Sequence, residues 1–369
     1  MQKIKGSKIE IKSCHKLTKR TLPLLYTPGV AKLSKEIAKD KKRVFDYTFK
    51  KNSVAIVSDG SAVLGLGNLG PEAALPVMEG KALLFKELAG IDAVPIVLAT
   101  QDADEIIKTV VNIAPTFGGI NLEDISAPRC FGIENQLIEK LNIPVFHDDQ
   151  HGTAIAVLAG LINALKVVGK NIRKVKIVIS GAGAAGITIA KLLLNYGAEN
   201  IIVFDSQGPL CAKRAYKKNG GKNKLARLTN KGDFTGNLRE ALTCADVFIG
   251  VSVPGLLKAI DIRRMNPGAI VFAMSNPVPE ISYKEAKYGG AAVVATGRSD
   301  FPNQINNALV FPGIFRGALD TRTRFITDKI KIRTALAIAS LVKKPKSDKI
   351  VPGVLDKGIA KAVANAFNL

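Results

Sequence analysis

Short apolar runs alternate with segments of helical periodicity in the first part of the chain. The runs at 53–57 and 93–98 are typical of buried strands, and helical patterns occupy 79–88 and 100–111. The second helical pattern opens with acidic residues, which favour a helix N-terminus. This alternation predicts an α/β domain. Two shorter strands are expected at 119–122 and 145–146.

A second alternation follows a long alanine-rich helix that is expected to begin near Thr153. Its strand candidates are apolar almost throughout, as is typical of parallel strands that are covered by helices on both faces. Amphipathic helical patterns occupy 328–342 and 357–367. The strand candidates lie at 176–179, 201–204, 247–251, 269–272 and 292–294.

The fold class that follows is α/β, with an N-terminal α/β domain and a Rossmann-like, doubly wound domain. A chain of 369 residues is long enough for two such domains. We place the first domain at 1–151 and the Rossmann-like domain at 152–297. We expect the last segment, 298–369, to be helical and to return to the first domain.

One glycine motif has the full context of a dinucleotide-binding turn. Gly181, Gly183 and Gly186 form G-x-G-x-x-G directly after an apolar strand, Ala184 lies where the next helix opens, and Asp205 ends the following strand. The glycines would let a pyrophosphate approach the helix N-terminus, and the carboxylate would accept hydrogen bonds from a ribose hydroxyl. Because Asp205 would repel a 2′-phosphate, the sequence favours NAD and leaves NADP open.

The stretch FHDDQHGTA, at 146–154, places two acids between two of the three histidines of the chain. His147 and His151 have the i, i+4 spacing of a zinc site on a helix. The helix is expected to begin only at Gly152 or Thr153, however. His147 would then lie in a strand or turn, which argues against zinc.

The acidic residues indicate a different kind of metal site. Glu123 and Asp124 follow one expected parallel strand, and Asp148 and Asp149 follow another. The carboxyl ends of such strands converge where α/β folds bind ligands. Carboxylates suit a hard cation, Mg²⁺ or Mn²⁺, better than zinc. On the residues alone, a helix cap with nearby surface acids is an equal alternative.

A net charge of +22 opens a different class of function, that of a basic nucleic-acid-binding protein. The basic residues are spread along the whole chain, however, and the protein has no tryptophan. We therefore expect no nucleic-acid partner. A positive surface would instead attract a small anionic substrate.

Cysteine usage and hydropathy bear on location. The four cysteines are scattered without a C-x-x-C pattern, which suits a reducing cytoplasm. The polar, basic start does not resemble a secretory signal. The longest apolar segment is interrupted by Asn163 and Lys166, which predicts a buried helix and no membrane span. We expect a cytoplasmic protein.

Several motifs, in order along nearly the whole chain, resemble those of the small prokaryotic form of malic enzyme. Some of them are long and rarely occur together elsewhere, so the resemblance is specific. The motifs are YTPGVA (26–31), VSDGSAVLGLGNLGP (57–71), MEGKALLFKELAGIDAVPI (78–96), LEDISAPRCF (122–131), FHDDQHGTA (146–154), ISGAGAAG (179–186), GVSVPG (250–255), SNPVPE (275–280) and QINNALVFPG (304–313).

The resemblance implies roles for residues of the first domain, which would hold the metal and the substrate. Glu123, Asp124 and Asp149 match the metal ligands of the family. Asp148 lies beside them as a partner in the proton network. Lys81 matches the general base, which requires a lowered lysine pKa. A neighbouring divalent cation and a partly desolvated pocket would provide that shift.

The resemblance also implies roles for residues outside the acidic stretches. Tyr26 matches the acid that protonates the enolate, and both Tyr26 and Lys81 would contact the substrate. Asn276 and Asn307 match amides that contact the substrate or the nicotinamide. Gly132 departs from the family, which usually has glutamate at this position.

The implied reaction converts (S)-malate to pyruvate and CO₂ with reduction of NAD(P)⁺, in the presence of Mg²⁺ or Mn²⁺. Decarboxylation of oxaloacetate is expected as well. The alternatives are a malolactic or a plain malate dehydrogenase activity on the same scaffold. The resemblance further implies a homodimer.

Overall fold

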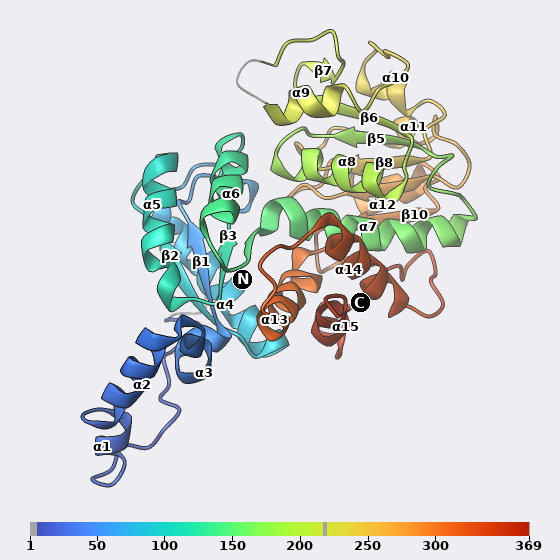
Figure 1. The fold of residues 1–369 in the computed structure, drawn as a ribbon. Coiled ribbons are helices and arrows are strands. Elements are labelled where there is room, and N and C mark those ends of the chain that lie inside the picture. Colours follow the sequence, from blue (N-terminus) through green and yellow to red (C-terminus); the bar gives the residue numbers. More distant parts are fainter. Residues whose placement is uncertain (1–5, 217–219, 369) are drawn as a thin grey trace.

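The structure, a computed structural model, describes residues 6–216 and 220–368. Two sheets of mostly parallel strands form the cores of two lobes (Figure 1). The long helix α7 (Asp148–Val168) leads from the first sheet to the second. The predicted α/β class is therefore confirmed.

The first sheet has the strand order β2-β1-β3-β4, and all of its strands are parallel. Its elements are β1 (Ser53–Ser58), β2 (Asp92–Val97), β3 (Gly119–Leu122), β4 (Val145–His147), α4 (Pro71–Ala89), α5 (Ala103–Ile113) and α6 (Arg129–Lys140). Successive residues of a strand point to opposite faces of the sheet. Ile56 accordingly packs in an apolar cluster with α4, and Val57 packs in another with α5 and α6. The sheet is thus covered on both faces.

Two helices begin earlier than the sequence pattern predicted. α7 begins at Asp148 instead of near Thr153, and α4 begins at Pro71. Proline suits the first helical position because the N–H group that it lacks would have no partner within the helix there. Asp148 and Asp149 suit the first turn of α7, where the helix dipole favours negative charge. Gly152 lies inside the helix, and a Cβ on it would collide with the Asp148 carboxylate.

The second sheet has the strand order β10-β9-β8-β5-β6-β7, and only β7 is antiparallel to its neighbour. Its strands are β5 (Lys176–Ser180), β6 (Asn200–Asp205), β7 (Gly208–Pro209), β8 (Val247–Gly250), β9 (Ile270–Ala273) and β10 (Val293–Thr296). Each strand predicted for this sheet is present. The strand order changes direction at β5, where Rossmann-like sheets open a ligand-binding crevice.

Helices cover both faces of the second sheet. They are α8 (Ala184–Tyr196), α9 (Gly220–Ala226), α10 (Leu238–Leu242), α11 (Ala259–Ile262) and α12 (Tyr283–Tyr288). α7 and α8 pack together on one face, and α10, α11 and α12 contribute to the apolar cluster on the other. α7 is long and apolar enough to cross a membrane, but most of it is buried inside the fold, so it is a core helix.

The C-terminal helices lie between the lobes and along α7. α13 (Phe311–Thr321) and α15 (Ile359–Asn365) pack against α4 of the first lobe, and α14 (Asp328–Ser340) packs against α7. Asn163, which interrupts the apolar face of α7, donates its amide to two carbonyl oxygens of the C-terminal segment. The division of the chain after residues 151 and 297 stays a prediction.

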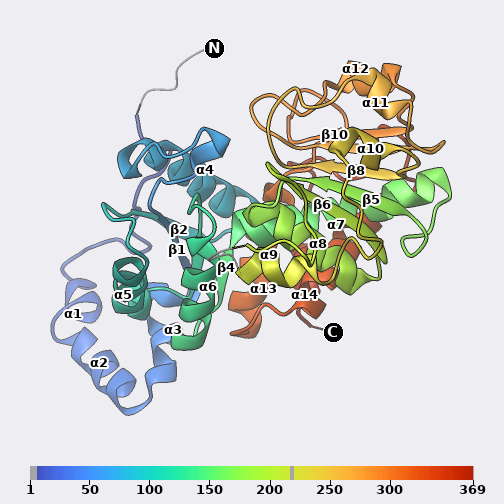
Figure 2. The same ribbon diagram turned by 90° about the horizontal axis from the view of Figure 1, so that it is seen from above.

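The N-terminal residues 16–39, which we call the N-terminal arm, project from the first lobe (Figures 1 and 2). The arm contains α1 (Leu22–Leu25) and α2 (Gly29–Lys39), and neither helix has a buried residue. The sequence patterns did not predict these helices. The remaining elements are α3 (Val44–Tyr47) and the short 3-10 helices η1 (Lys41–Arg43), η2 (Phe49–Asn52), η3 (Val63–Gly65), η4 (Ala114–Thr116) and η5 (Asn307–Leu309).

Candidate active site

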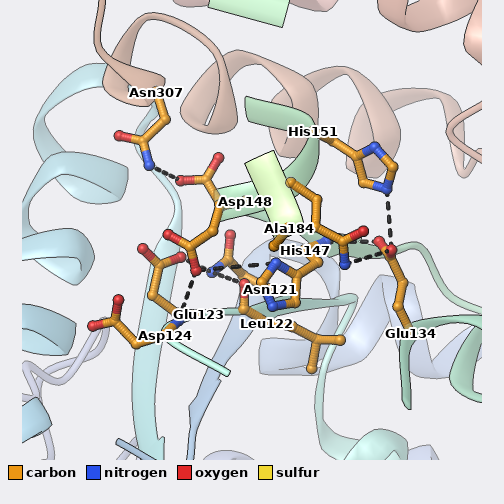
Figure 3. A network of polar contacts seen from close by, with 12 residues as sticks. Asn121, Leu122, Glu123, Asp124, Glu134, His147, Asp148, His151, Ala184 and Asn307 are labelled. Atoms are coloured by element: carbon orange, nitrogen blue, oxygen red, sulfur yellow. Dashed lines mark hydrogen bonds and ion pairs between the residues drawn. The ribbon is translucent and has the colours of Figure 1, made fainter. Parts of the chain in front are cut away.

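A cluster of carboxylates lies at the carboxyl ends of β3 and β4 (Figure 3). Glu123 and Asp124 follow β3 directly, and Asp149 lies in the first turn of α7, which follows β4. One oxygen atom from each of these carboxylates lies within 4.8 Å of the others. The backbone N–H of Asp124 donates to Asp149 Oδ2 at 2.8 Å. The parallel pairing of the two strands therefore brings the predicted ligands together.

The side chains of the acidic cluster offer only carboxylate oxygens as metal ligands. Such oxygens are the ligands that a hard divalent cation prefers. Asp124 Oδ2 is buried and has no hydrogen-bond partner among the described residues. Asp124 also has a φ of 53°, in a region that costs free energy for a residue other than glycine. Strained backbone and an unused buried oxygen both fit a ligand position. The residues present therefore fit Mg²⁺ or Mn²⁺.

Burying these carboxylates in their charged form costs free energy unless a cation lies between them. Burial and the nearby charge of Asp149 raise the pKa of Asp124 to about 7. Burial also raises the pKa of Glu123 well above its usual range, although Lys81 opposes this shift. A divalent cation would favour the charged form of each carboxylate and so reverse both shifts.

Lys81 lies against this cluster and is buried, with only 6% of its side chain exposed. Its ammonium group lies 2.9 Å from Glu123 Oε2 and forms an ion pair with Asp148 Oδ2. The amide of Asn307 donates to the same Asp148 oxygen at 2.6 Å. The ammonium also lies 3.8 Å from the centroid of the Phe311 ring. The structure thus brings together three elements that are distant in sequence, α4, α7 and η5.

Without a cation, the pKa of Lys81 is raised, whereas the lowered pKa that we expected for the metal-bound site stays a prediction. Burial lowers the pKa of Lys81, but the carboxylates of Asp148 and Glu123 outweigh burial and raise it above its usual value. Burial raises the pKa of Asp148 to about 6, although Lys81 opposes this shift. The expectation depended on a neighbouring cation, whose charge acts on the lysine in the opposite direction to the carboxylates.

The two histidines of the FHDDQHGTA stretch do not face each other as a zinc pair. His151 Nε2 lies 3.1 Å from Glu134 Oε2, and the backbone N–H of His147 donates to the other Glu134 oxygen at 2.8 Å (Figure 3). Gln150 also donates to Glu134, at 3.2 Å. His147 Nδ1 lies 4.0 Å from Asp149 Oδ2, too far for a hydrogen bond. Glu134, whose hydrogen bonds connect α6 to α7, could not be identified from the sequence.

The glycine motif forms the turn between β5 and α8, as predicted. Gly181 has a φ of 111°, which side chains other than glycine rarely adopt, and a Cβ on Gly186 would collide with the Gly181 carbonyl. α8 begins at Ala184, directly after Gly183. The first N–H groups of α8 have no partners within the helix, which is the arrangement that binds a pyrophosphate.

Asp205 ends β6 as predicted, but two cations accompany it. Its Oδ2 is ion-paired with Arg214 and lies 2.7 Å from Lys222 Nζ. Although burial alone would raise the pKa of Asp205, hydrogen bonds from Lys222, Arg214 and the backbone of Gln207 lower it. Neither cation was predicted, because the chain after β7 folds back onto the end of β6. The end of β6 therefore carries net positive charge instead of the single negative charge that the sequence indicated.

Two predicted site residues lie on other parts of the molecule. Tyr26 is 67% exposed and belongs to the N-terminal arm. Asn276 is exposed in the loop after β9, yet a Cβ on Gly65 would lie 3.2 Å from its carbonyl oxygen. The loop of Gly65 also brings the Leu64 N–H to 3.4 Å from Asp124 Oδ1. Asn276 therefore lies near the acidic cluster, across the boundary between the lobes, whereas Tyr26 does not contact it within the chain.

Arg129 is a cation near the cluster that the sequence analysis did not identify. Its guanidinium group lies 2.5 Å from the buried Asp59. The other oxygen of Asp59 accepts from Ser61, and the N–H of Ala62 donates to the Asp124 carbonyl at 2.9 Å. The ion pair thus fixes the loop that supports Asp124. Only the fold relates Arg129 to Asp59, since no short sequence spacing connects them.

Comparison with known proteins gives matches along nearly the whole chain. A model of the malic enzyme N-terminal domain matches residues 4–138, and a model of the malic enzyme NAD binding domain matches residues 150–367. The chain is 54% identical to the bifunctional malic/malolactic enzyme of Bacillus subtilis, over 98% of this chain and 87% of the relative. It is 53% identical to the NAD-dependent malic enzyme of Geobacillus stearothermophilus, over 98% of this chain and 74% of the relative.

A solved structure has the same fold. The crystal structure of the NAD-dependent malic enzyme from Thermotoga maritima superposes with a TM-score of 0.95 at 47% sequence identity. The superposition covers 98% of this chain and 96% of the other. The arrangement of the two lobes is therefore shared along the whole length of the chain.

Proposed function

This chain belongs to the malic enzyme family, and we propose how its residues divide the NAD(P)-dependent oxidative decarboxylation of malate between them. The observation that carries the proposal is the buried Lys81, which lies between Asp148 and Glu123 beside a group of carboxylates suited to a divalent cation. A charged lysine is rarely buried in this way unless it is paired. Its position beside the acidic cluster and its hydrogen bond to Asp148 support a role as the base of the reaction.

In the first step, Lys81 accepts the C2 hydroxyl proton of (S)-malate while a hydride passes from C2 to NAD⁺. Lys81 must be neutral to accept this proton, and its hydrogen bond to Asp148 offers a route for its own proton. Asn307 donates to the same carboxylate and so orients it. The products of this step are oxaloacetate and NADH.

In the second step, the C3–C4 bond of oxaloacetate breaks and CO₂ leaves. The bonding electrons pass toward the C2 carbonyl, and Tyr26 then protonates C3 to give pyruvate. Glu123, Asp124 and Asp149 would hold Mg²⁺ or Mn²⁺, which polarises the C2 oxygen when bound. Added oxaloacetate is expected to enter at this step and to be decarboxylated as well.

Product analysis tests this function directly. Purified protein is incubated with (S)-malate, NAD⁺ and Mn²⁺, with and without a chelator. Pyruvate and NADH are expected in equal amounts, and both should disappear on chelation. Stable oxaloacetate with NADH would show a plain dehydrogenase instead.

A malolactic activity is the second candidate, because the similar protein of Bacillus subtilis is named a bifunctional malic/malolactic enzyme. In that reaction the hydride returns from NADH to pyruvate, so lactate forms without net NADH. The same product analysis separates the two activities. Lactate in place of pyruvate, with no rise in NADH absorbance, would favour the malolactic reaction.

We further propose that the protein is a homodimer in which Tyr26 serves the active site of the second copy. The N-terminal arm exposes Leu17, Leu22, Leu24 and Leu25 together with Tyr26. Clustered exposed apolar side chains of this kind are typical of interfaces. The arm also points away from the lobe that carries Lys81 (Figure 1).

The four cysteines are all free, which supports a cytoplasmic location.

Subunit mixing is expected to restore activity to two inactive variants. Lys81→Ala and Tyr26→Phe each disable both sites of their own homodimer. A hybrid dimer has one intact site if the tyrosine comes from the partner, because one pairing combines native Lys81 with native Tyr26. Random mixing should therefore recover about a quarter of the wild-type rate, since half of the dimers are hybrids with one working site. No recovery after verified subunit exchange would place both residues in one chain.

We propose NAD as the preferred cofactor and NADP as a second one. Asp205 disfavours a 2′-phosphate, but Arg214 and Lys222 already bind the Asp205 carboxylate and offset its charge. The same two cations would bind a phosphate if the carboxylate were absent. The balance between these three groups sets the cofactor preference.

Asp205→Ala is expected to raise the ratio of kcat/KM for NADP to that for NAD by at least about tenfold, which corresponds to roughly 1.4 kcal/mol. The loss of the carboxylate removes the repulsion of a 2′-phosphate, while the positive charges of Arg214 and Lys222 remain at the end of β6. Steady-state kinetics with both cofactors measure the ratio. Asp233→Ala is the control, because Asp233 is an exposed acid that pairs with Lys213. An unchanged ratio in Asp205→Ala would disprove this role.

A further inference from the structure

A cavity of about 630 Å³ lies between the lobes and is separate from the acidic cluster. It is bordered by α6 from the first lobe, by α8 and α9 from the second, by α7 and by α14. Figure 2 shows how these helices are arranged. Along α8, the lining residues Thr188, Lys191, Leu192 and Asn195 recur at helical spacing and so form one face. Neither the acidic cluster nor Asp205 borders the cavity. The reaction proposed above leaves this space unused.

Among the described residues, three lysines from three different helices border the cavity. They are Lys191 of α8, Lys224 of α9 and Lys331 of α14. Lys331 forms an ion pair with Asp328 at 3.1 Å, whereas Lys191 and Lys224 have no hydrogen bond or ion pair within the described part of the chain. Burial, and then the positive charge of Lys224, lower the pKa of Lys191. The lysines are thus close enough to disfavour each other's charge.

The acids that border the cavity already have partners. Glu134 accepts hydrogen bonds from Gln150 and His151, and Asp328 accepts from Asn195 at 2.9 Å as well as from Lys331. Neither carboxylate pairs with Lys191 or Lys224. The cavity therefore has positive charge that the protein itself does not neutralise, and an anion would stabilise it.

We propose that this cavity binds a phosphate monoester of a small metabolite. Lysine ammonium groups bind phosphate as point charges, whereas planar carboxylates are matched best by arginine, and no arginine borders the cavity. The volume lies within the usual range for small-molecule sites and exceeds what a phosphate alone needs. Phe131, Ile138 and Leu192 supply apolar wall for the organic part. The bound ligand would contact both lobes and so favour one arrangement of them.

Gly132 keeps the cavity open on the α6 side. It borders the cavity, and a Cβ built on it meets no atom within 4 Å. A glutamate at this position would add both volume and a negative charge. Gly132 lies in the first turns of α6, where a glutamate is also favoured by the helix dipole. A variant that fills the cavity should therefore fold normally.

Isothermal titration calorimetry with ribose 5-phosphate tests the proposal. The titration contains no divalent metal, and saturating NAD⁺ is present to fill the dinucleotide crevice. Saturable binding is expected, with ribose giving no signal and succinate at least about tenfold weaker binding. Gly132→Glu and the double variant Lys191→Met/Lys224→Met should each weaken binding at least about tenfold. Gly132→Ala, which adds neither charge nor much volume, should bind as the native protein does.

Three results would overturn this proposal. One is the absence of saturable ribose 5-phosphate binding to the native protein at millimolar concentration. The second is binding that Gly132→Glu and the double lysine variant leave unchanged. The third is binding in a titration without NAD⁺ that saturating NAD⁺ abolishes, which would place the ligand in the dinucleotide crevice. Binding is measured without turnover, so the outcome does not depend on the malate reaction.

Discussion

Lys81→Ala is expected to lower kcat for malate oxidation by roughly a thousandfold, while the affinity for NAD⁺ stays within about twofold of the native value. The ammonium group lies against Asp148 and Glu123 at the acidic cluster, and no other lysine among the described residues contacts these carboxylates. Its removal takes away the group that accepts the hydroxyl proton. The NAD⁺ crevice lies on the other lobe, so cofactor binding should not change. Steady-state kinetics and NAD⁺ titration measure the two effects.

The control for Lys81→Ala is Lys86→Ala. Lys86 lies on the same helix, but it is exposed and pairs only with Asp92. This control should retain nearly full activity, because exposed ion pairs contribute little. A small primary amine added to Lys81→Ala should restore part of the rate if the role is that of a base. Loss of NAD⁺ binding or of folding in Lys81→Ala would instead show that the lysine is structural.

Most of the fold could be predicted from the apolar pattern. Every parallel strand of the second sheet was predicted, because buried parallel strands such as β5 and β8 are continuous apolar runs, whereas the short antiparallel β7 was missed. Helix starts were less accurate. The polar stretch before Thr153 suggested a loop, but its acids are stable in the first turn of α7, where they meet Lys81 and the backbone of Asp124. The N-terminal arm was missed because its apolar residues face no core within the chain.

The candidate site was only partly predictable for a similar reason. Glu123, Asp124 and Asp149 could be grouped because each acid pair follows a parallel strand. Lys81 could not be placed from the residues alone, since a single lysine in a helix is usually exposed. The partners of Asp205 could not be predicted either, because a loop of irregular structure returns Arg214 and Lys222 to the strand end. Contacts of this kind depend on the tertiary fold and leave no short spacing in the sequence.

Asp124→Asn is expected to weaken Mn²⁺ binding by at least about a hundredfold and to abolish measurable malate oxidation. The substitution removes one of the clustered carboxylates, whose buried Oδ2 has no hydrogen-bond partner in the described part of the chain. Mn²⁺ titration followed by electron paramagnetic resonance measures the affinity. Glu87→Gln, an exposed acid on α4, is the control and should bind Mn²⁺ normally. Retained Mn²⁺ affinity in Asp124→Asn would exclude Asp124 as a ligand.

The pH dependence of stability gives an independent test of the same carboxylate. The pKa of Asp124 is raised to about 7 in the folded, metal-free protein, so the folded state binds more protons than the unfolded state between about pH 4 and pH 7. Stability from this group is therefore present at low pH and is lost as the pH rises through this window. The metal-free native protein should lose more thermal stability between pH 5.5 and pH 7.5 than Asp124→Asn does, with Glu87→Gln behaving as the native protein. Added Mn²⁺ should stabilise the native protein at pH 7.5 and leave Asp124→Asn nearly unchanged, because only the native site gains a ligand that favours the charged carboxylates. Equal pH profiles of thermal stability for the native protein and Asp124→Asn would show that ionisation of the buried carboxylate does not destabilise the fold. That result would remove the electrostatic argument for a cation at this position.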